Sequence, residues 1–305
     1  MKKYLIVVFV FTTFLYSCES ESFVEEEIEE IEEVICDGGT FVGLVNLTTQ
    51  REVEEFGSLC YTKIDGTLVI NDLDETDDKI TDLSSLINLT EIYTETYPDS
   101  LFASLHFRTS LLRDFQGFNN LERVGRIVIQ NNLNLTSLNG LESLTSVVTE
   151  NDVFLNEIAI IDNILLQNLD GLNNLHTIGG GSNTSRLFIK GNSVLENIDG
   201  LESLSIVGSP TSEELESYNI IHIFGNRQLQ NINGLSSLTA IYKSISFYFH
   251  GDLGSPTIGN NSLTDFCGLQ NFLINGVYHN AETATYSYDG FNPTIEEIIA
   301  GDCSL

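Results

Sequence analysis

The fold is decided by one repeated unit, whose clearest copy is LFIKGNSVLENIDGLESL (Leu187–Leu204). The unit begins with an alternating stretch, residues 187–190, which is typical of a strand that buries one face. Asn192 follows at a turn, and Gly200 marks a corner after further apolar residues. The pattern therefore predicts one coil of a solenoid, made of a strand, an asparagine turn and a glycine corner.

Copies of this unit recur along most of the chain, and each is marked by a corner glycine. The corners are Gly117, Gly140, Gly171, Gly200, Gly234 and Gly268. Five of them have an asparagine eight residues earlier, and Thr109 or Ser110 stands there in the Gly117 copy. These asparagines are Asn132, Asn163, Asn192, Asn226 and Asn260. The shortest spacing, from Gly117 to Gly140, lies in the leucine-rich-repeat range of about 20–29 residues, and the longer ones indicate inserted loops.

The repeat assigns a role to each of its positions. Alternate strand residues are expected to point inward, because successive side chains of a strand face opposite sides. The expected inward pairs are Ile127/Ile129, Ile158/Ile160, Leu187/Ile189, Ile221/Ile223 and Phe247/Phe249. The asparagine is expected to hydrogen-bond turn backbone, and the glycine to supply a backbone angle that other residues avoid. One coil cannot bury its own apolar edge, so the copies are expected to stack.

The segment 1–17 is predicted to be a signal peptide. Lys2 and Lys3 precede the apolar run Tyr4–Tyr16, which is shorter than the ~20 residues of a spanning helix. The run ends at Leu15-Tyr16-Ser17-Cys18, which resembles the lipobox of bacterial lipoproteins. That resemblance implies that Cys18 is lipidated and anchors the chain to an outer membrane of a bacterial envelope. An ordinary signal peptide with an incidental cysteine is the alternative.

Residues 18–35 are predicted to be the lipidated cysteine and an acidic tether, since glutamate dominates the segment and like charges repel. Glu19 and Glu21 resemble a signal that directs some lipoproteins to the cell surface; a solvated linker is the alternative. The whole chain has 44 acidic residues, 13 basic residues and a net charge of -31. Such a charge disfavours nucleic acid as a partner, because phosphate backbones would be repelled.

The cysteines indicate an oxidising compartment. The chain has five, and lipidation of Cys18 would leave an even number for disulfides. The remaining four, Cys36, Cys60, Cys267 and Cys303, allow three connectivities. Their positions favour Cys36–Cys60 and Cys267–Cys303, one bond near each end of the mature chain.

Residues 36–305 are predicted to be a single solenoid domain. An N-terminal cap (36–64) would contain a helix at Asn46–Gly57, where Thr49 and Glu52 have capping-box spacing. Repeats would cover 65–270, and a C-terminal cap would cover 271–305. That cap would include a helix ending at Gly276, a strand near 286–288 and a helix from Asn292 to Gly301.

The unit from Asn192 to Leu204, with its copies at 132–144, 163–175 and 226–238, resembles the repeat of receptor L-domain proteins. The segments 263–270 and 292–303 are similar to the C-terminal end of bacterial lipoproteins with this repeat. The resemblance implies a mainly β, right-handed parallel β-helix or leucine-rich-repeat-like solenoid with short capping helices. It also implies non-catalytic binding of protein or glycan, without naming the binding residues.

Outward strand positions are the best binding candidates, because the core does not dictate them. One outward column reads His106, Val128, Ala159, Phe188, His222 and Tyr248, and the next reads Arg108, Gln130, Ile161, Lys190, Phe224 and His250. Aromatic side chains on a rigid sheet suit protein anchoring or sugar stacking. The candidates are His106, Arg108, Phe188, Lys190, His222, Phe224, Tyr248 and His250. Loops that cover this face are the alternative.

Other chemistry finds less support in the sequence. Shared zinc between His222 and His250 lacks carboxylate support, and the acidic loop 72–78 lacks the glycine and final glutamate of an EF-hand. Neither a cofactor nor a metal is therefore expected. The chain lacks a nucleophile elbow, a zinc-protease helix motif and a phosphate loop. A structural envelope component without a discrete ligand and a carbohydrate-active β-helix enzyme remain the alternatives to recognition.

Overall fold

The computed structural model describes residues 38–72, 77–93, 105–108, 110–148, 155–179, 185–209, 218–242, 244–248, 259–260, 262–277, 280–283, 291 and 293–305. They belong to one compact unit, Cys36–Leu305. The predicted signal peptide, Cys18 and the acidic tether lie outside the described residues, as do Cys36, Phe249 and His250.

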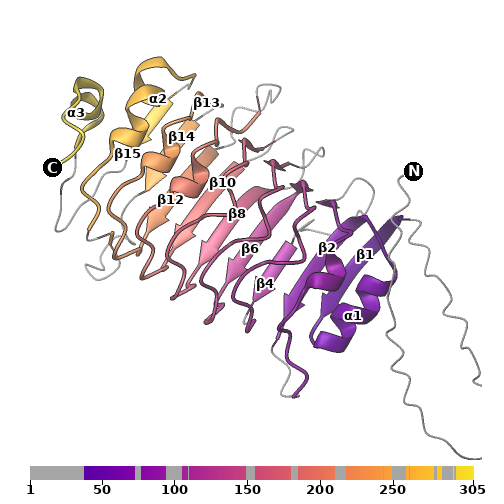
Figure 1. Cartoon of the computed structure of the whole chain (residues 1–305). Helices are drawn as coiled ribbons and strands as arrows, with labels where there is room; N and C mark the ends of the chain where they lie inside the picture. The colour runs from indigo at the N-terminus through magenta and orange to yellow at the C-terminus, as the bar shows by residue number, and fades with distance from the viewer. Residues whose placement is uncertain are drawn as a thin grey trace, which may run out of the picture. The chain divides into compact units, whose positions relative to one another are not determined.

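The protein is mainly β, and its described strands form one parallel sheet of fifteen strands (Figure 1). The longer strands are β1 (Thr40–Leu47), β2 (Lys63–Asn71), β4 (Leu105–Arg108), β6 (Arg126–Gln130), β8 (Asn156–Ile161), β10 (Ser185–Lys190), β12 (Tyr218–Phe224), β14 (Ser244–Tyr248) and β15 (Asn280–Thr283). The short strands are β3 (Glu91–Tyr93), β5 (Arg123–Val124), β7 (Ser146–Val147), β9 (Thr177–Ile178), β11 (Ile206–Val207) and β13 (Ala240–Ile241).

The sheet forks at β2 into two ladders. Residues 63–65 of β2 pair with β3, and residues 68–71 pair with β4. From there the short strands pair only with short strands and the long strands with long ones, in the order β13-β11-β9-β7-β5-β3-β2-β4-β6-β8-β10-β12-β14-β15. Because short and long strands alternate along the chain, each coil contributes one strand to each ladder, and the coils stack in a solenoid-like manner.

The variable repeat spacing has one main source. Only Gly125 separates β5 from β6, whereas residues 148–155, 179–184 and 208–217 separate the strands of the next three coils. These differences account for the spacing of the corner glycines from Gly117 to Gly234, but not for the last spacing, to Gly268, because only residues 242 and 243 separate β13 from β14. The predicted insertions of the three coils with β8, β10 and β12 therefore lie between the short and the long strand, and that of the coil with β14 follows its long strand.

The core is a continuous column of aliphatic side chains between the ladders. Every predicted inward residue whose side chain is described is at most 1 % exposed. The leucines of the opposite side, Leu144, Leu175, Leu204 and Leu238, are fully buried. Each such residue contributes about 1.5–3 kcal/mol through transfer of its side chain from water, so the stack of coils supplies the stability that one coil lacks.

The asparagines form a buried ladder along the stack. Nδ2 of Asn163 donates to the carbonyl oxygen of Ile129 at 3.0 Å and to Oδ1 of Asn192 at 3.3 Å. The backbone N–H of Asn163 also donates to Oδ1 of Asn192, at 3.0 Å. The pattern repeats from Asn132 to Asn260, and Ser110 begins it with a 2.8 Å hydrogen bond from its hydroxyl to Asn132. The predicted role in satisfying turn backbone is confirmed.

The predicted backbone angle is found at three of the six corner glycines, whereas a steric constraint applies to all six. A Cβ at any of the six would collide with the backbone of the preceding coil; at Gly140, for example, it would meet the carbonyl oxygen of Phe115. Only Gly117, Gly140 and Gly171 have positive φ. At the other three the chain forms 3₁₀ turns, η2 (Asp199–Leu201), η3 (Asn233–Leu235) and η4 (Cys267–Leu269). Close coil-to-coil approach, rather than a special backbone angle, is therefore common to all of them.

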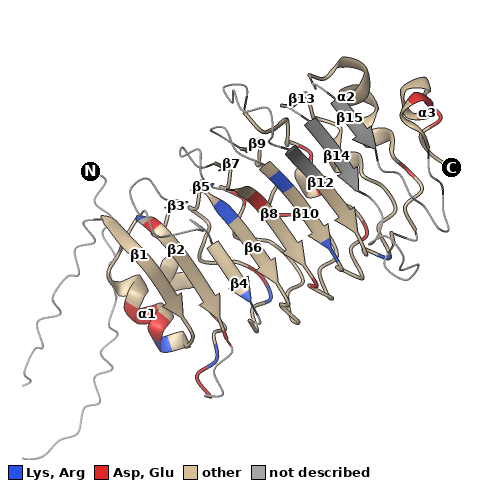
Figure 2. Ribbon diagram, turned by 180° about the vertical axis from the view of Figure 1, so that it is seen from behind, with Lys and Arg blue, Asp and Glu red and all other residues tan. Residues whose placement is uncertain are grey.

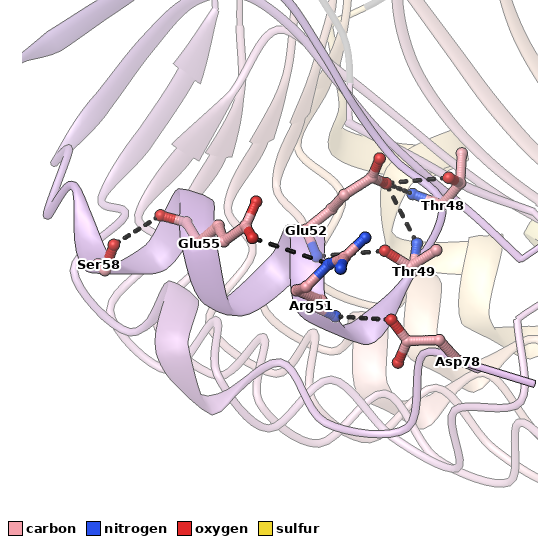
Figure 3. Close-up of polar contacts among 7 residues, drawn as sticks. All are labelled: Thr48, Thr49, Arg51, Glu52, Glu55, Ser58 and Asp78. Atoms are coloured by element: carbon pink, nitrogen blue, oxygen red, sulfur yellow. Dashed lines mark hydrogen bonds and ion pairs between the residues drawn. The ribbon is translucent and has the colours of Figure 1, made fainter.

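At the N-terminal end, helix α1 (Gln50–Ser58) covers the first coils. Thr49 and Glu52 form the predicted capping box, and Thr48 adds two hydrogen bonds to the Glu52 carboxylate (Figure 3). The predicted start of this helix at Asn46 is wrong, because residues 46 and 47 pair with β2 as the end of β1. Gly57 lies inside the helix, where a Cβ would collide with Ser85 of the turn η1 (Ser84–Leu86).

At the C-terminal end, α2 (Gln270–Asn275) ends at Gly276 as predicted, and α3 (Ile295–Ala300) ends at Gly301 with φ +96°. The cap of α3 is Thr294, which pairs with Glu297, and not the predicted Asn292, because Thr294 completes a capping box. The predicted strand near 286–288 lies outside the described residues. Cys267 and Cys303 form the expected disulfide, with Cα atoms 5.0 Å apart. Cys60 is also disulfide-bonded.

Candidate functional site

The outward face of the long-strand ladder aligns the candidate residues as predicted. One column pairs His106, Val128, Ala159, Phe188, His222 and Tyr248 across β4 to β14. The next pairs Arg108, Gln130, Ile161, Lys190 and Phe224. We call the outward positions of β4, β6, β8, β10 and β12 the outer face. Of Tyr248 only the backbone pairing is described, and His250 lies outside the described residues.

A third column holds a charged triad that the sequence analysis missed. Arg126, Glu157 and Arg186 lie on the adjacent strands β6, β8 and β10, and their Cα atoms are in register. Arg126 binds Oε2 of Glu157 through Nε at 2.6 Å and Nη2 at 2.5 Å, and Arg186 binds Oε1 through the same two nitrogens. Extending the alternation two residues toward the start of each strand would have revealed this column.

Glu157 is fully buried, although it points to the outer side of the sheet. The side chains of Arg126 and Arg186 are 16 % and 32 % exposed, so the two guanidinium groups flank the carboxylate and remain partly open to solvent. A buried carboxylate of this kind is stable only when such partners satisfy its oxygens. The triad carries a net charge of +1, since two guanidinium groups share one carboxylate.

An aromatic cluster lies beside the triad on β10 and β12. The ring of Phe188 is 5.6 Å from that of His222 and 5.5 Å from that of Phe224, in the latter case edge to face. The guanidinium of Arg186 lies 5.3 Å from the Phe188 ring centre, and the ammonium of Lys190 lies 5.3 Å from that of Phe224. Cations therefore border the rings of this cluster.

The outer face is only partly accessible. Val128, Ala159 and Phe224 are 3 %, 2 % and 7 % exposed, whereas Arg108 is exposed. His106, Phe188, Lys190 and His222 are half-buried. The prediction that Phe224 is an exposed binding residue is wrong, because Phe188, His222 and Lys190 pack around its ring. Phe224 instead supports these neighbours. Arg108, Lys190, Arg186 and Phe188 remain within reach of a ligand.

The charge of the outer face is opposite to that of the chain. Its described charged side chains are Arg108, Arg126, Arg186 and Lys190 against Glu157, a net charge of +3, while the whole chain carries -31. Figure 2 shows these as blue segments on β4, β6 and β10 and a red segment on β8. Among the described residues, neither Arg108 nor Lys190 has an acidic partner. The described residues of the outer face are therefore basic, although the chain as a whole is acidic.

His106 lies at the N-terminal edge of this basic surface. Burial, together with the positive charges of Arg126 and Arg108, lowers its pKa to about 4. Its Nε2 atom is buried without a hydrogen-bond partner among the described residues. The adjacent outward residues of β2, Val69 and Asn71, carry no charge. At neutral pH His106 is therefore an uncharged imidazole with an unused polar atom between two arginines.

The proposed metal sites gain no support from the described geometry. The part of the chain that the structure describes contains no group of three or more His, Cys, Asp or Glu side chains placed to hold a metal ion. In the acidic loop, Asp72 forms an ion pair with Lys79 at 3.2 Å, and Asp78 accepts a hydrogen bond from the backbone N–H of Arg51. Asp74 lies outside the described residues.

None of the helices among the described residues is long and apolar enough to cross a membrane. Comparison with known proteins adds no name: no protein-family model, no curated protein and no solved structure matches the chain.

Proposed function

We propose that the protein is a non-catalytic recognition module: a surface lipoprotein whose solenoid binds a protein or glycan through the outer face of its long-strand ladder. The observation that carries the proposal is the composition of that face. Basic and aromatic side chains gather there, at positions that neither the core nor the coil corners constrain. Rigid strands hold them in register, which lowers the entropy lost when a ligand binds.

The finer fold class belongs to the same proposal. A right-handed, leucine-rich-repeat-like solenoid of the receptor L-domain type is supported by the short and long parallel ladders, the buried asparagine ladder and the closely packed glycine corners. Lipidation of Cys18 and anchoring at the outer membrane are supported by the sequence before residue 36. These features would present the solenoid outward from an envelope on an acidic tether.

The test is a glycan array together with a pull-down of envelope and host proteins, using the full-length chain in detergent. Phe188→Ala on the outer face is compared with Leu133→Ala, a 55 % exposed apolar residue at a turn. The proposal predicts that the first variant loses capture with little change in melting temperature, while the second keeps it. Capture that is the same in both variants and in the wild-type protein would refute the outer face as the recognition surface.

A further inference from the structure

We propose that the outer face binds a short acidic saccharide, such as an oligomer of uronic acids, laid across strands β4 to β10. This inference rests on the proposed function, because it names the ligand class of the same surface. It commits to carboxylate-bearing sugar rather than to neutral glycan or to protein.

Charge is the first reason. In a chain with 44 acidic residues and 13 basic ones, a basic side chain would be expected to find a carboxylate. Arg108 and Lys190 nevertheless have no acidic partner among the described residues, and Arg126 and Arg186 share the single carboxylate of Glu157. The described residues of the outer face therefore carry an excess of positive charge that a ligand carboxylate would balance.

Geometry is the second reason. Basic side chains on β4, β6 and β10 form a row along the stack. Neighbouring strands lie ~4.8 Å apart, close to the length of one pyranose ring, so Arg108 and Lys190 are three strand spacings apart, roughly 14 Å, and Arg126 and Arg186 are two apart, roughly 10 Å. Arg108 and Lys190 occupy one column of this row, and the triad occupies another. A uronic acid oligomer that runs across the strands with one ring per strand would place the carboxylates of its first and fourth rings near Arg108 and Lys190. Guanidinium groups bind carboxylates side-on, as Arg126 and Arg186 already do with Glu157.

The aromatic side chains favour sugar over an acidic peptide. Phe188 is half-buried beside Arg186, which offers an apolar ring edge and a cation to the same ligand unit. An extended peptide gains most of its affinity by adding a strand at a sheet edge. The strands β4 to β10 pair on both sides with other strands, so they leave no such edge on this surface. A peptide would be limited to side-chain contacts.

Nucleic acid is disfavoured by the charge of the rest of the molecule. A phosphate backbone extends well beyond the row of basic residues and would meet the surrounding negative charge of a chain at -31. A short saccharide with one charge per ring fits within the basic surface.

The test is calorimetric titration of the full-length chain in detergent with a hexamer of galacturonic acid. The probes for comparison are the fully methyl-esterified hexamer, which is neutral, and a short poly-glutamate peptide. The double variant Arg108→Gln/Lys190→Gln removes two exposed or half-buried cations of the outer face. The matched control is Arg51→Gln, a cation on α1 whose side chain is 75 % exposed.

The inference predicts that the acid hexamer binds, that the ester binds at least about tenfold more weakly, and that the double variant weakens acid binding by about tenfold while Arg51→Gln does not. Added salt should weaken binding, because exposed charges are screened. Binding of the ester or of another neutral glycan at the same face would overturn the inference and leave the proposed function standing. Tighter binding of poly-glutamate than of the acid hexamer would also overturn the inference, because the ligand would then be an acidic peptide, and would leave the proposed function standing. If no probe and no array ligand binds, both proposals fail.

Discussion

Nε of Arg126 on β6 donates to Oε2 of Glu157 on β8 across 2.6 Å, on the outer side of the sheet rather than in the core. With Arg186 on the opposite side, this pair fixes a carboxylate among the described charged side chains of the outer face, the others of which are positive. The triad of Arg126, Glu157 and Arg186 links three successive coils through their strands β6, β8 and β10. One buried carboxylate therefore holds two cations of the outer face in place.

Replacement of Glu157 by glutamine should destabilise the protein by about 3 kcal/mol, because two guanidinium groups on neighbouring strands would lose their shared counter-charge. Urea unfolding gives the free-energy difference. Glu122→Gln is the control, since Glu122 is exposed and takes part in the coil-to-coil bonds through its backbone N–H and carbonyl, which the substitution leaves in place. If Glu157→Gln costs no more than an exposed ion pair does, about 0.5 kcal/mol, the triad is not a structural tie.

Replacement of Asn192 by alanine should cost about 2–4 kcal/mol, because the side chain of Asn192 accepts from the backbone of Asn163 and donates to the carbonyl oxygen of Ile160, and both groups would be left buried without partners. Each of these two hydrogen bonds is 3.0 Å long. Thermal unfolding of Asn174→Ala provides the comparison, because that exposed asparagine makes a single bond to the carbonyl oxygen of Glu142. Equal losses in the two variants would contradict the ladder's structural role.

The corner glycines allow steric and conformational effects to be separated. The corner glycine Gly200 has no positive φ, but a Cβ there would collide with the carbonyl oxygen of Leu169. Gly301, which ends α3, has φ +96°, and a Cβ there would make only an ordinary contact with Nε2 of Gln270 at 3.5 Å. Gly301→Ala should therefore cost about 1–2 kcal/mol, from the backbone angle alone. Gly200→Ala should cost more, because two coils must move apart. If urea unfolding shows a larger loss of stability for Gly301→Ala than for Gly200→Ala, the close approach of the coils does not explain the recurring glycine.

His106 should make stability depend on pH in a defined window. Its pKa is lowered from 6.5 to about 4, so the native state keeps the imidazole neutral while the unfolded chain takes up a proton below pH 6.5. The unfolded state then binds more protons, and stability is full above pH 6.5 and falls as the pH drops toward 4. The loss attributable to His106 is on the order of 2 kcal/mol at pH 4.

The measurement is the difference in unfolding free energy between the wild-type protein and His106→Gln from pH 7 to pH 4. His176→Gln serves as the control, since His176 is exposed. A difference that does not change over this window would contradict the burial of a neutral His106 between two arginines.

The repeat made much of this architecture predictable. Equivalent positions of adjacent coils contact one another, so the same residue type is required at that position in every copy. This holds for the alternating strand residues such as 187–190, for the asparagine column and for the corner glycines. The capping box of α1 was predictable for the same reason, as a local pattern with one geometric solution. The end of β1 was not, because residues 46 and 47 gain a parallel neighbour in β2, which is distant in the sequence.

The binding surface was less predictable, because its side chains depend on neighbours that no repeat specifies. The columns of His106 and Arg108 followed from register alone. The burial of Phe224 did not, since it results from the particular rings and cation packed around it. Glu157 was not predicted as a site residue, because it has no acidic counterpart in the other coils. Its role becomes apparent only from its position between Arg126 and Arg186 on the neighbouring strands.

The most direct test of the account is the titration of His106 by NMR in the presence and absence of the galacturonic acid hexamer. A carboxylate bound near Arg108 and Arg126 would offset the positive charges that help to lower the pKa of His106. Saturating hexamer is expected to raise this pKa above its value of about 4. A His106 titration that does not move while calorimetry detects binding would place the ligand elsewhere and contradict the outer face as the recognition surface.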